Sequence, residues 1–148
     1  MKRFAVMGLG KMGVDWVANL LEGGHEVVGF DNFSAARERA PGALAKGLGW
    51  IAKKRHPDEA DFAEKATARF RIVDSEDEFA QALGSCQILL EVILEDLDLK
   101  CEVLARVAPH LPADGMVWTN TSSLSVHTMG VASGPVSFMR LYDASTEV

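Results

Sequence analysis

Residues 3–31 read RFAVMGLGKMGVDWVANLLEGGHEVVGFD, and this stretch decides the fold. Residues 3–7 form a short apolar run that ends at Gly8, as expected of a buried strand. A helix is predicted next, up to the Gly23-Gly24 pair, because apolar residues recur at helical spacing: Met12, Trp16, Val17, Leu20 and Leu21. A second strand is predicted at 26–30. A strand, a helix and a strand within about 30 residues favour a parallel pair joined by a right-handed crossover.

A glycine pattern, Gly8-x-Gly10-x-x-Gly13, lies between the first strand and the helix, with Leu9 and Met12 inside it. Gly8 allows a tight turn, Gly10 lets the backbone approach a pyrophosphate, and Gly13 lets the helix pack closely on the strand. The free N–H groups and positive dipole end of the helix favour phosphate here. We therefore expect this loop to bind a dinucleotide; the alternative is that its glycines serve only the turn.

Asp31 ends the second predicted strand. At this point of a strand-helix-strand unit, a carboxylate accepts hydrogen bonds from ribose hydroxyls and repels a 2′-phosphate. The predicted cofactor is therefore NAD. Arg37 lies close enough in sequence to leave NADP as an alternative, and FAD is a further one that the rest of the chain disfavours.

Residues 34–68 form a helical excursion that is longer than a simple crossover needs. Ser34 can cap a first helix, which Pro41-Gly42 is expected to break near Ala40. A second helix is predicted over 43–55, and a third from Pro57 to about residue 68.

The remainder of the chain continues the alternation of strands and helices. Strands are predicted at 70–73, 86–93, 116–119 and 136–142, with helices over 75–84, 97–108 and 126–131. Ser75 and Glu78 form a capping-box pattern at the first of these helices. We expect a single α/β domain over 1–148, with a Rossmann-type, doubly wound and mainly parallel sheet and a helical insert after the second strand.

Composition excludes several classes of partner. The 148 residues are 48% hydrophobic with a net charge of −6, which argues against nucleic acid or an anionic membrane surface. No apolar run approaches the roughly 20 residues of a membrane span. Cys86 and Cys101 lie in apolar segments and are expected to be small buried hydrophobes in a reducing, cytoplasmic compartment, with no metal site.

Five stretches together resemble the NAD-binding domain of the 3-hydroxyacyl-CoA dehydrogenases: AVMGLGKMG, GGHEVVGFD, AKKRHPDEADFAEKATARF, LLEVILEDLDLK and TNTSSLSV. The resemblance implies that Glu95 and Lys100 border the cofactor, that Asn120 lies by the nicotinamide, and that Ser122 hydrogen-bonds the substrate oxygen. It also implies that the helical insert is an arm for CoA. Lys53 and Lys54 would then face CoA phosphates, the alternative being an ordinary solvated helix end.

The run Asn120-Thr121-Ser122-Ser123 follows the end of a predicted strand, where open α/β sheets hold ligands. Short polar side chains can orient a carbonyl or alcohol oxygen there. Alternatively, this run only caps the helix that follows.

The resemblance fails after the last strand. There the family has a His-Phe-Phe-Asn-Pro motif whose histidine is the general base, paired with a later glutamate; this chain has Arg140-Leu141-Tyr142-Asp143-Ala144. Arginine remains protonated near neutral pH and cannot act as a base. Arg140 could polarise a carbonyl, clamp a carboxylate, or only pair with Asp143, and Glu147 would have lost the residue that it orients.

His127 is an alternative proton carrier, or an ordinary helix-surface histidine. The family's C-terminal helical domain is expected to be absent, because the sequence stops at Val148.

Two hypotheses follow. The first is an NAD-dependent oxidoreductase of the 3-hydroxyacyl-CoA dehydrogenase type, acting on an acyl thioester or a related hydroxy acid. The second is a non-catalytic dinucleotide-binding module or subunit. A homodimer that forms an altered site across its interface is a third alternative.

Overall fold

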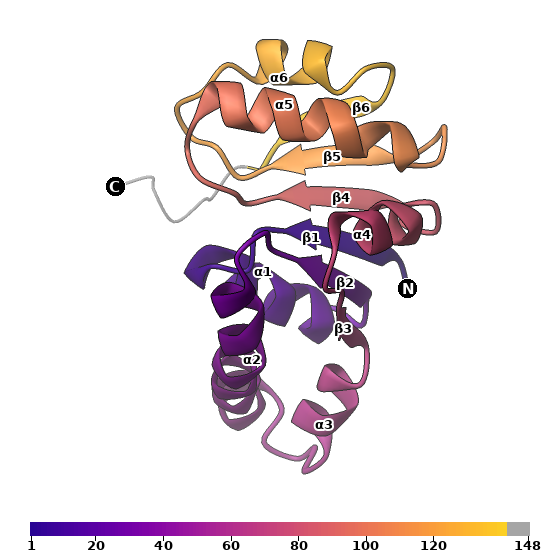
Figure 1. Ribbon diagram of the computed structural model, residues 1–148. Helices are drawn as coiled ribbons and strands as arrows, with labels where there is room; N and C mark the ends of the chain where they lie inside the picture. The colour runs from indigo at the N-terminus through magenta and orange to yellow at the C-terminus, as the bar shows by residue number, and fades with distance from the viewer. Residues whose placement is uncertain (142–148) are drawn as a thin grey trace.

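The computed structural model describes residues 1–141, which form a six-stranded parallel sheet in the order β3-β2-β1-β4-β5-β6 (Figure 1). The strands are β1 (Arg3–Met7), β2 (Glu26–Phe30), β3 (Phe70–Ile72), β4 (Ile88–Glu91), β5 (Met116–Thr119) and β6 (Ser137–Arg140). This order reverses direction between β1 and β4, as in a doubly wound Rossmann sheet. The predicted fold class is confirmed.

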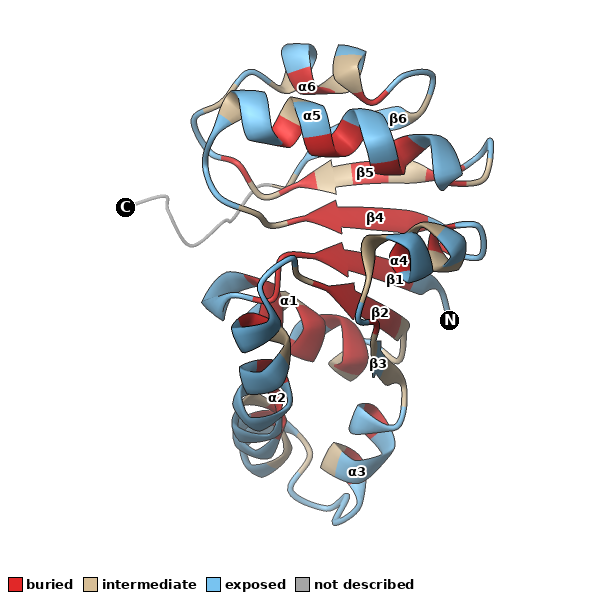
Figure 2. Ribbon diagram, viewed as in Figure 1, coloured by how far each residue is buried: buried red, intermediate tan, exposed pale blue. Residues whose placement is uncertain are grey.

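Helices cover both faces of the sheet. They are α1 (Lys11–Glu22), α2 (Ser34–Arg55), α3 (Phe62–Thr67), α4 (Glu76–Leu83), α5 (Leu97–Val107), the 3₁₀ turn η1 (Ala108–His110) and α6 (Val126–Ala132). The first three pack on one apolar core and the others on a second core across the sheet. The central strands β1 and β4 are almost entirely buried between these layers (Figure 2).

The helical insert differs from the expectation. Helix α2 runs without a break through Pro41, so the predicted end near Ala40 is wrong. A proline inside a helix costs about 3 kcal/mol. An apolar stripe that continues beyond the proline, and that is buried in the first core, offsets this cost: Ala36, Ala40, Leu44, Leu48 and Ile51. The third helix is shorter than predicted, because its first buried side chain is Phe62.

Strand β4 is also shorter than the apolar run at 86–93 predicted. The Cys86 N–H bonds back to the Leu83 carbonyl in the turn after α4, and the Ile93 N–H donates to the side chain of Glu91. The N–H groups at the two ends of the run, residues 86 and 93, therefore make no hydrogen bond to a neighbouring strand. The Ser75 cap of α4 is confirmed, since its Oγ accepts from the Glu78 N–H at 3.2 Å.

The register brings the carboxyl ends of the strands to one edge. Met7 lies opposite Phe30 and Glu91, and Thr119 lies opposite Glu91 and Arg140. The segments that follow these residues are therefore neighbours along a single edge. In an open α/β sheet this edge is where ligands bind.

Cys86 and Cys101 are both free thiols. Cys86 is fully buried, and burial raises the pKa of its thiol to about 11. It is therefore a small core hydrophobe, as expected, whereas Cys101 is only half-buried on α5.

Candidate functional site

The glycine loop has the geometry that its pattern predicts. Gly8 has φ of +100°, and a Cβ there would lie 2.4 Å from the Val92 carbonyl oxygen. A Cβ on Gly13 would lie 1.9 Å from the Gly8 carbonyl oxygen, so α1 packs closer to the turn than any other residue type allows. Gly10 is exposed and has nothing within 4 Å of the Cβ position, which leaves its backbone open to a ligand.

Asp31 connects the glycine loop to the end of β2. Its Oδ2 accepts from the Leu9 N–H at 2.8 Å and its Oδ1 from the Phe33 N–H at 2.9 Å. A carboxylate has about four acceptor positions, so it keeps capacity for ribose hydroxyls. Arg37 donates to the Asp31 carbonyl oxygen at 2.6 Å, so its guanidinium is tied to the backbone beside the carboxylate.

A cavity of about 410 Å³ lies between these loops and the segment after β4. Its apolar wall includes Phe33 and Leu94, each 66% exposed, and its polar rim includes Arg39, Glu76 and Arg106. Asp31 and Gly10 open into the same space. Sequence reasoning missed Phe33 and Leu94; the available signal was a large apolar residue just after each strand end.

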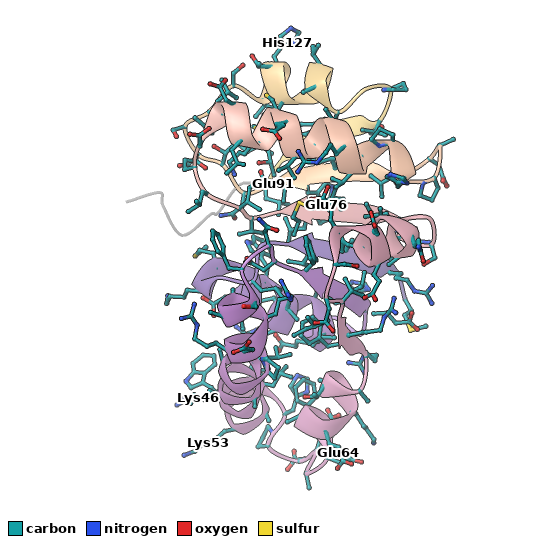
Figure 3. All side chains as sticks on the ribbon, in the orientation of Figure 1. Lys46, Lys53, Glu64, Glu76, Glu91 and His127 are labelled. Carbon is teal, nitrogen blue, oxygen red and sulfur yellow. The ribbon has the colours of Figure 1, made fainter. Side chains whose placement is uncertain are left out.

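Glu91, Lys100 and Thr119 form a buried network next to this cavity. Glu91 is 0% exposed and Lys100 1% exposed, and the Lys100 Nζ lies 2.5 Å from Glu91 Oε1. Glu91 Oε2 accepts from the Thr119 hydroxyl at 2.7 Å, and Oε1 from the Ile93 N–H at 2.7 Å. Figure 3 shows Glu91 near the carboxyl edge.

Lys100, expected to border the cofactor, lies behind the segment that lines the cavity. The ammonium is enclosed and donates to Glu91 and to the Ile93 carbonyl, so it holds the β4 loop in place instead of facing the cavity. Sequence reasoning missed Glu91 because a glutamate in an apolar run carries no sign of its buried partner.

Glu95 lies next to this network and binds the polar loop after β5. It accepts hydrogen bonds from the hydroxyls of Thr121 and Ser123, and its Oε2 is 3.5 Å from the Lys100 Nζ. Burial alone raises the pKa of Glu95, but the two hydroxyls and the Lys100 charge together lower it below its usual value. Glu95 therefore remains ionised and orders Thr121 and Ser123.

The loop after β5 presents the two residues predicted near the reaction. Asn120 is half-buried, and its Oδ1 accepts from the Trp16 indole Nε1–H at 2.9 Å. Ser122 is exposed on the loop. Sequence reasoning placed Trp16 only in the apolar stripe of α1 and missed its polar contact.

Arg140, which the resemblance in sequence sets against the family's histidine, donates to the Ser122 carbonyl oxygen at 3.3 Å and to the Leu124 carbonyl oxygen at 2.6 Å. It therefore braces the loop that carries Ser122. Asp143, named as an alternative partner of Arg140, and the catalytic candidate Glu147 lie outside the described residues.

The remaining candidates lie apart from this edge. Lys53 and Lys54 are exposed in the last turn of α2, and Figure 3 shows Lys53 at the distal end of that helix. His127 is exposed on α6 and points away from the sheet (Figure 3). The structure does not bring any of the three to the Asn120 loop.

Within residues 1–141, no helix is both long and apolar enough to cross a membrane. In the same part of the chain, no three His, Cys, Asp or Glu side chains are grouped so that they could hold a metal ion.

Comparison with known proteins agrees with this geometry. A family model described as 3-hydroxyacyl-CoA dehydrogenase, NAD binding domain, matches residues 3–136. A probable 3-hydroxybutyryl-CoA dehydrogenase of Deinococcus radiodurans is 26% identical over 95% of this chain and 49% of its own length. An L-carnitine dehydrogenase of Nocardiopsis dassonvillei is 32% identical over 87% of this chain and 37% of its own length.

Among solved structures, (S)-3-hydroxybutyryl-CoA dehydrogenase from Ralstonia eutropha superposes with a TM-score of 0.81 at 23% identity, over 96% of this chain and 50% of that one. At this identity the likeness shows the fold alone. The chain spans about half the length of the first of its curated relatives. The family model covers most of the chain and describes an NAD binding domain, which confirms the predicted cofactor, and the chain belongs to the 3-hydroxyacyl-CoA dehydrogenase NAD-binding domain family.

Proposed function

We propose that this chain is the NAD-binding part of an oxidoreductase that transfers a hydride between nicotinamide and a 3-hydroxyacyl or 3-ketoacyl thioester, or a related hydroxy acid. One observation carries the proposal: a single sheet edge holds the glycine loop, the Asp31 carboxylate and the Asn120–Ser122 loop. The first two suit a dinucleotide, and the last supplies short polar groups where a substrate oxygen would lie.

The roles follow from the residues in place. Backbone N–H groups at Gly10 and the start of α1 would hold the pyrophosphate, and Asp31 would accept from the ribose hydroxyls. NAD, when bound, supplies the hydride acceptor. The Ser122 hydroxyl would donate to the substrate oxygen, and Lys53 and Lys54 would meet phosphates of a CoA lying along α2.

A specific observation favours a second candidate, a non-catalytic dinucleotide-binding module. Arg140 uses its guanidinium to brace backbone carbonyls, and an arginine cannot take the alcohol proton near neutral pH. Under this candidate, NADH binding survives and turnover does not.

The experiment is a titration of NADH by fluorescence, followed by an acetoacetyl-CoA reduction assay with the wild-type chain and Arg140→His. We expect NADH binding in both proteins, with reduction that rises in Arg140→His. NADH binding without turnover in either would leave the second candidate for this chain, and absence of NADH binding would overturn both.

The finer expectations belong to this proposal too. We place the protein in the cytoplasm, supported by its free thiols, and name a homodimer as its assembly. Size-exclusion chromatography with light scattering tests the dimer; a monomeric mass would remove it.

A further inference from the structure

Trp16 links helix α1 to the loop after β5. Its ring packs against the first apolar core while its Nε1–H reaches Asn120 Oδ1, 104 positions later in the chain. The Asn120 backbone is fixed as well, since its N–H donates to the Glu91 carbonyl at 3.0 Å. Both the main chain and the side chain of Asn120 are therefore held.

The direction of this hydrogen bond sets what Asn120 can offer. An indole nitrogen only donates, whereas an amide carries one accepting oxygen and one nitrogen with two donors. The oxygen of Asn120 must therefore face Trp16, and its Nδ2 must face the other way. An asparagine left free could present either end.

We propose that Trp16 is a positioning residue of the cofactor site, which turns Asn120 into a fixed donor for a carbonyl oxygen. This inference rests on the proposed function. The carbonyl is either the carboxamide oxygen of the nicotinamide or the keto oxygen of the substrate, two sources of the same acceptor chemistry.

Wild-type protein tests the assignment directly by ¹⁵N NMR. The Trp16 indole N–H and the Asn120 side-chain amide are identified by the loss of their signals in Trp16→Phe and Asn120→Asp. We expect the Trp16 N–H to exchange with solvent more slowly than that of the exposed Trp50, and the Asn120 amide signals to move on addition of NAD⁺ but not of ADP-ribose, which lacks nicotinamide. Movement only when acetoacetyl-CoA is added to the NAD⁺ complex would identify the substrate oxygen as the acceptor.

Affinity supplies the second measurement. Trp16→Phe keeps an aromatic ring but removes the N–H. If the acceptor is the nicotinamide carboxamide, the Kd for NAD⁺ rises about three- to tenfold, on the scale of one hydrogen bond, with the Kd for ADP-ribose unchanged. If the acceptor is the substrate, the same rise is expected in the Kd for acetoacetyl-CoA on the NAD⁺ complex. Trp50→Phe, a substitution of an exposed tryptophan on α2, should change none of these values.

Equal losses for both ligands would reduce Trp16 to a structural role and overturn the proposal. The proposal is also overturned if the Asn120 side-chain amide signals move with none of the ligands while calorimetry shows that NAD⁺ binds. If neither ADP-ribose nor NAD⁺ binds the wild-type chain, the proposed function fails, and this inference fails with it.

Discussion

The two halves of the carboxyl edge are held in different ways. Around β1 and β2, backbone groups fix the glycine loop: Gly13 packs against the Gly8 carbonyl, and the N–H groups of Leu9 and Phe33 donate to the Asp31 carboxylate. Around β4, β5 and β6, side chains donate most of the contacts that hold the loops: Lys100 and Thr119 donate to Glu91, and Arg140 donates to two loop carbonyls.

Because of this difference, dinucleotide binding and catalysis depend on different parts of the edge. Backbone groups at the glycine loop need only glycine and a carboxylate to accept a dinucleotide, and both are present. The second half depends on particular side chains, and one of them is Arg140, which cannot act as a base near neutral pH. A domain can therefore keep its ability to bind a dinucleotide while its catalytic residues change.

The largest expected effect comes from breaking the buried pair in the second half. Lys100→Met leaves Glu91 as an uncompensated buried charge, which costs about 3–5 kcal/mol in the free energy of unfolding. Urea unfolding followed by circular dichroism measures it. Glu91→Gln combined with Lys100→Met should recover part of the loss, because the unpaired charge is removed while an amide oxygen still accepts a hydrogen bond from Thr119 or from the Ile93 N–H.

Lys11→Met is the matched control. Its ammonium lies 3.8 Å from Asp15 with the side chain 90% exposed, and such surface pairs contribute about 0–1 kcal/mol. Similar losses in Lys100→Met and Lys11→Met would contradict the view that the second half depends on its buried pair.

The next effect tests the backbone packing of the first half. Gly13→Ala places a methyl group against the Gly8 carbonyl, so the free energy of unfolding should fall by about 3 kcal/mol, the upper end of the usual cost of an overpacked core. Gly10→Ala meets open space and should leave stability nearly unchanged, while it weakens NADH binding. If the two variants are equally stable, the close packing is not what fixes this loop.

The sequence predicted the first half better than the second. A glycine pattern followed by a carboxylate is local, so Gly8, Gly10, Gly13 and Asp31 could be assigned from spacing alone. The partners of Lys100 and Trp16 lie on other elements, and Pro41 suggested a helix break that long-range packing overrides. Side-chain pairs across elements leave no spacing in the sequence, so they could not be predicted.

Asp31 gives the third effect, on ligand affinity. Asp31→Ala should weaken NADH binding by about 1–3 kcal/mol, the scale of a lost charge-assisted hydrogen bond. It should also reduce the preference for NADH over NADPH, because the carboxylate no longer repels a 2′-phosphate. Fluorescence titrations with both cofactors measure this. Asp31→Asn, which keeps one acceptor oxygen, should lose less; unchanged NADH affinity in both would exclude the ribose contact.

The smallest effect lies at His56 in the helical insert, away from the carboxyl edge, where side chains hold three helices together. The ring stacks on Phe62, its Nδ1 lies 3.0 Å from Glu59 and its Nε2 3.3 Å from Glu22, which also pairs with Arg55. The contact with Glu59, followed by that with Glu22, raises the pKa of His56 above its ordinary value of 6.5. His56 thus ties the ends of α1 and α2 to the start of α3.

The sign of the pH dependence follows from that direction. Protonated His56 favours the folded chain, so its contribution is complete below about pH 6.5 and is lost as the pH rises through the folded-state value. Between about pH 6 and pH 8, the wild type should therefore lose stability relative to His56→Gln. Urea unfolding of both proteins across this range measures the difference between their free energies of unfolding. His25, whose pKa is lowered mainly by burial, contributes in the opposite direction, but it is present in both proteins and cancels in the difference. If His56→Gln shows the wild-type slope, the His56 cluster does not hold the insert.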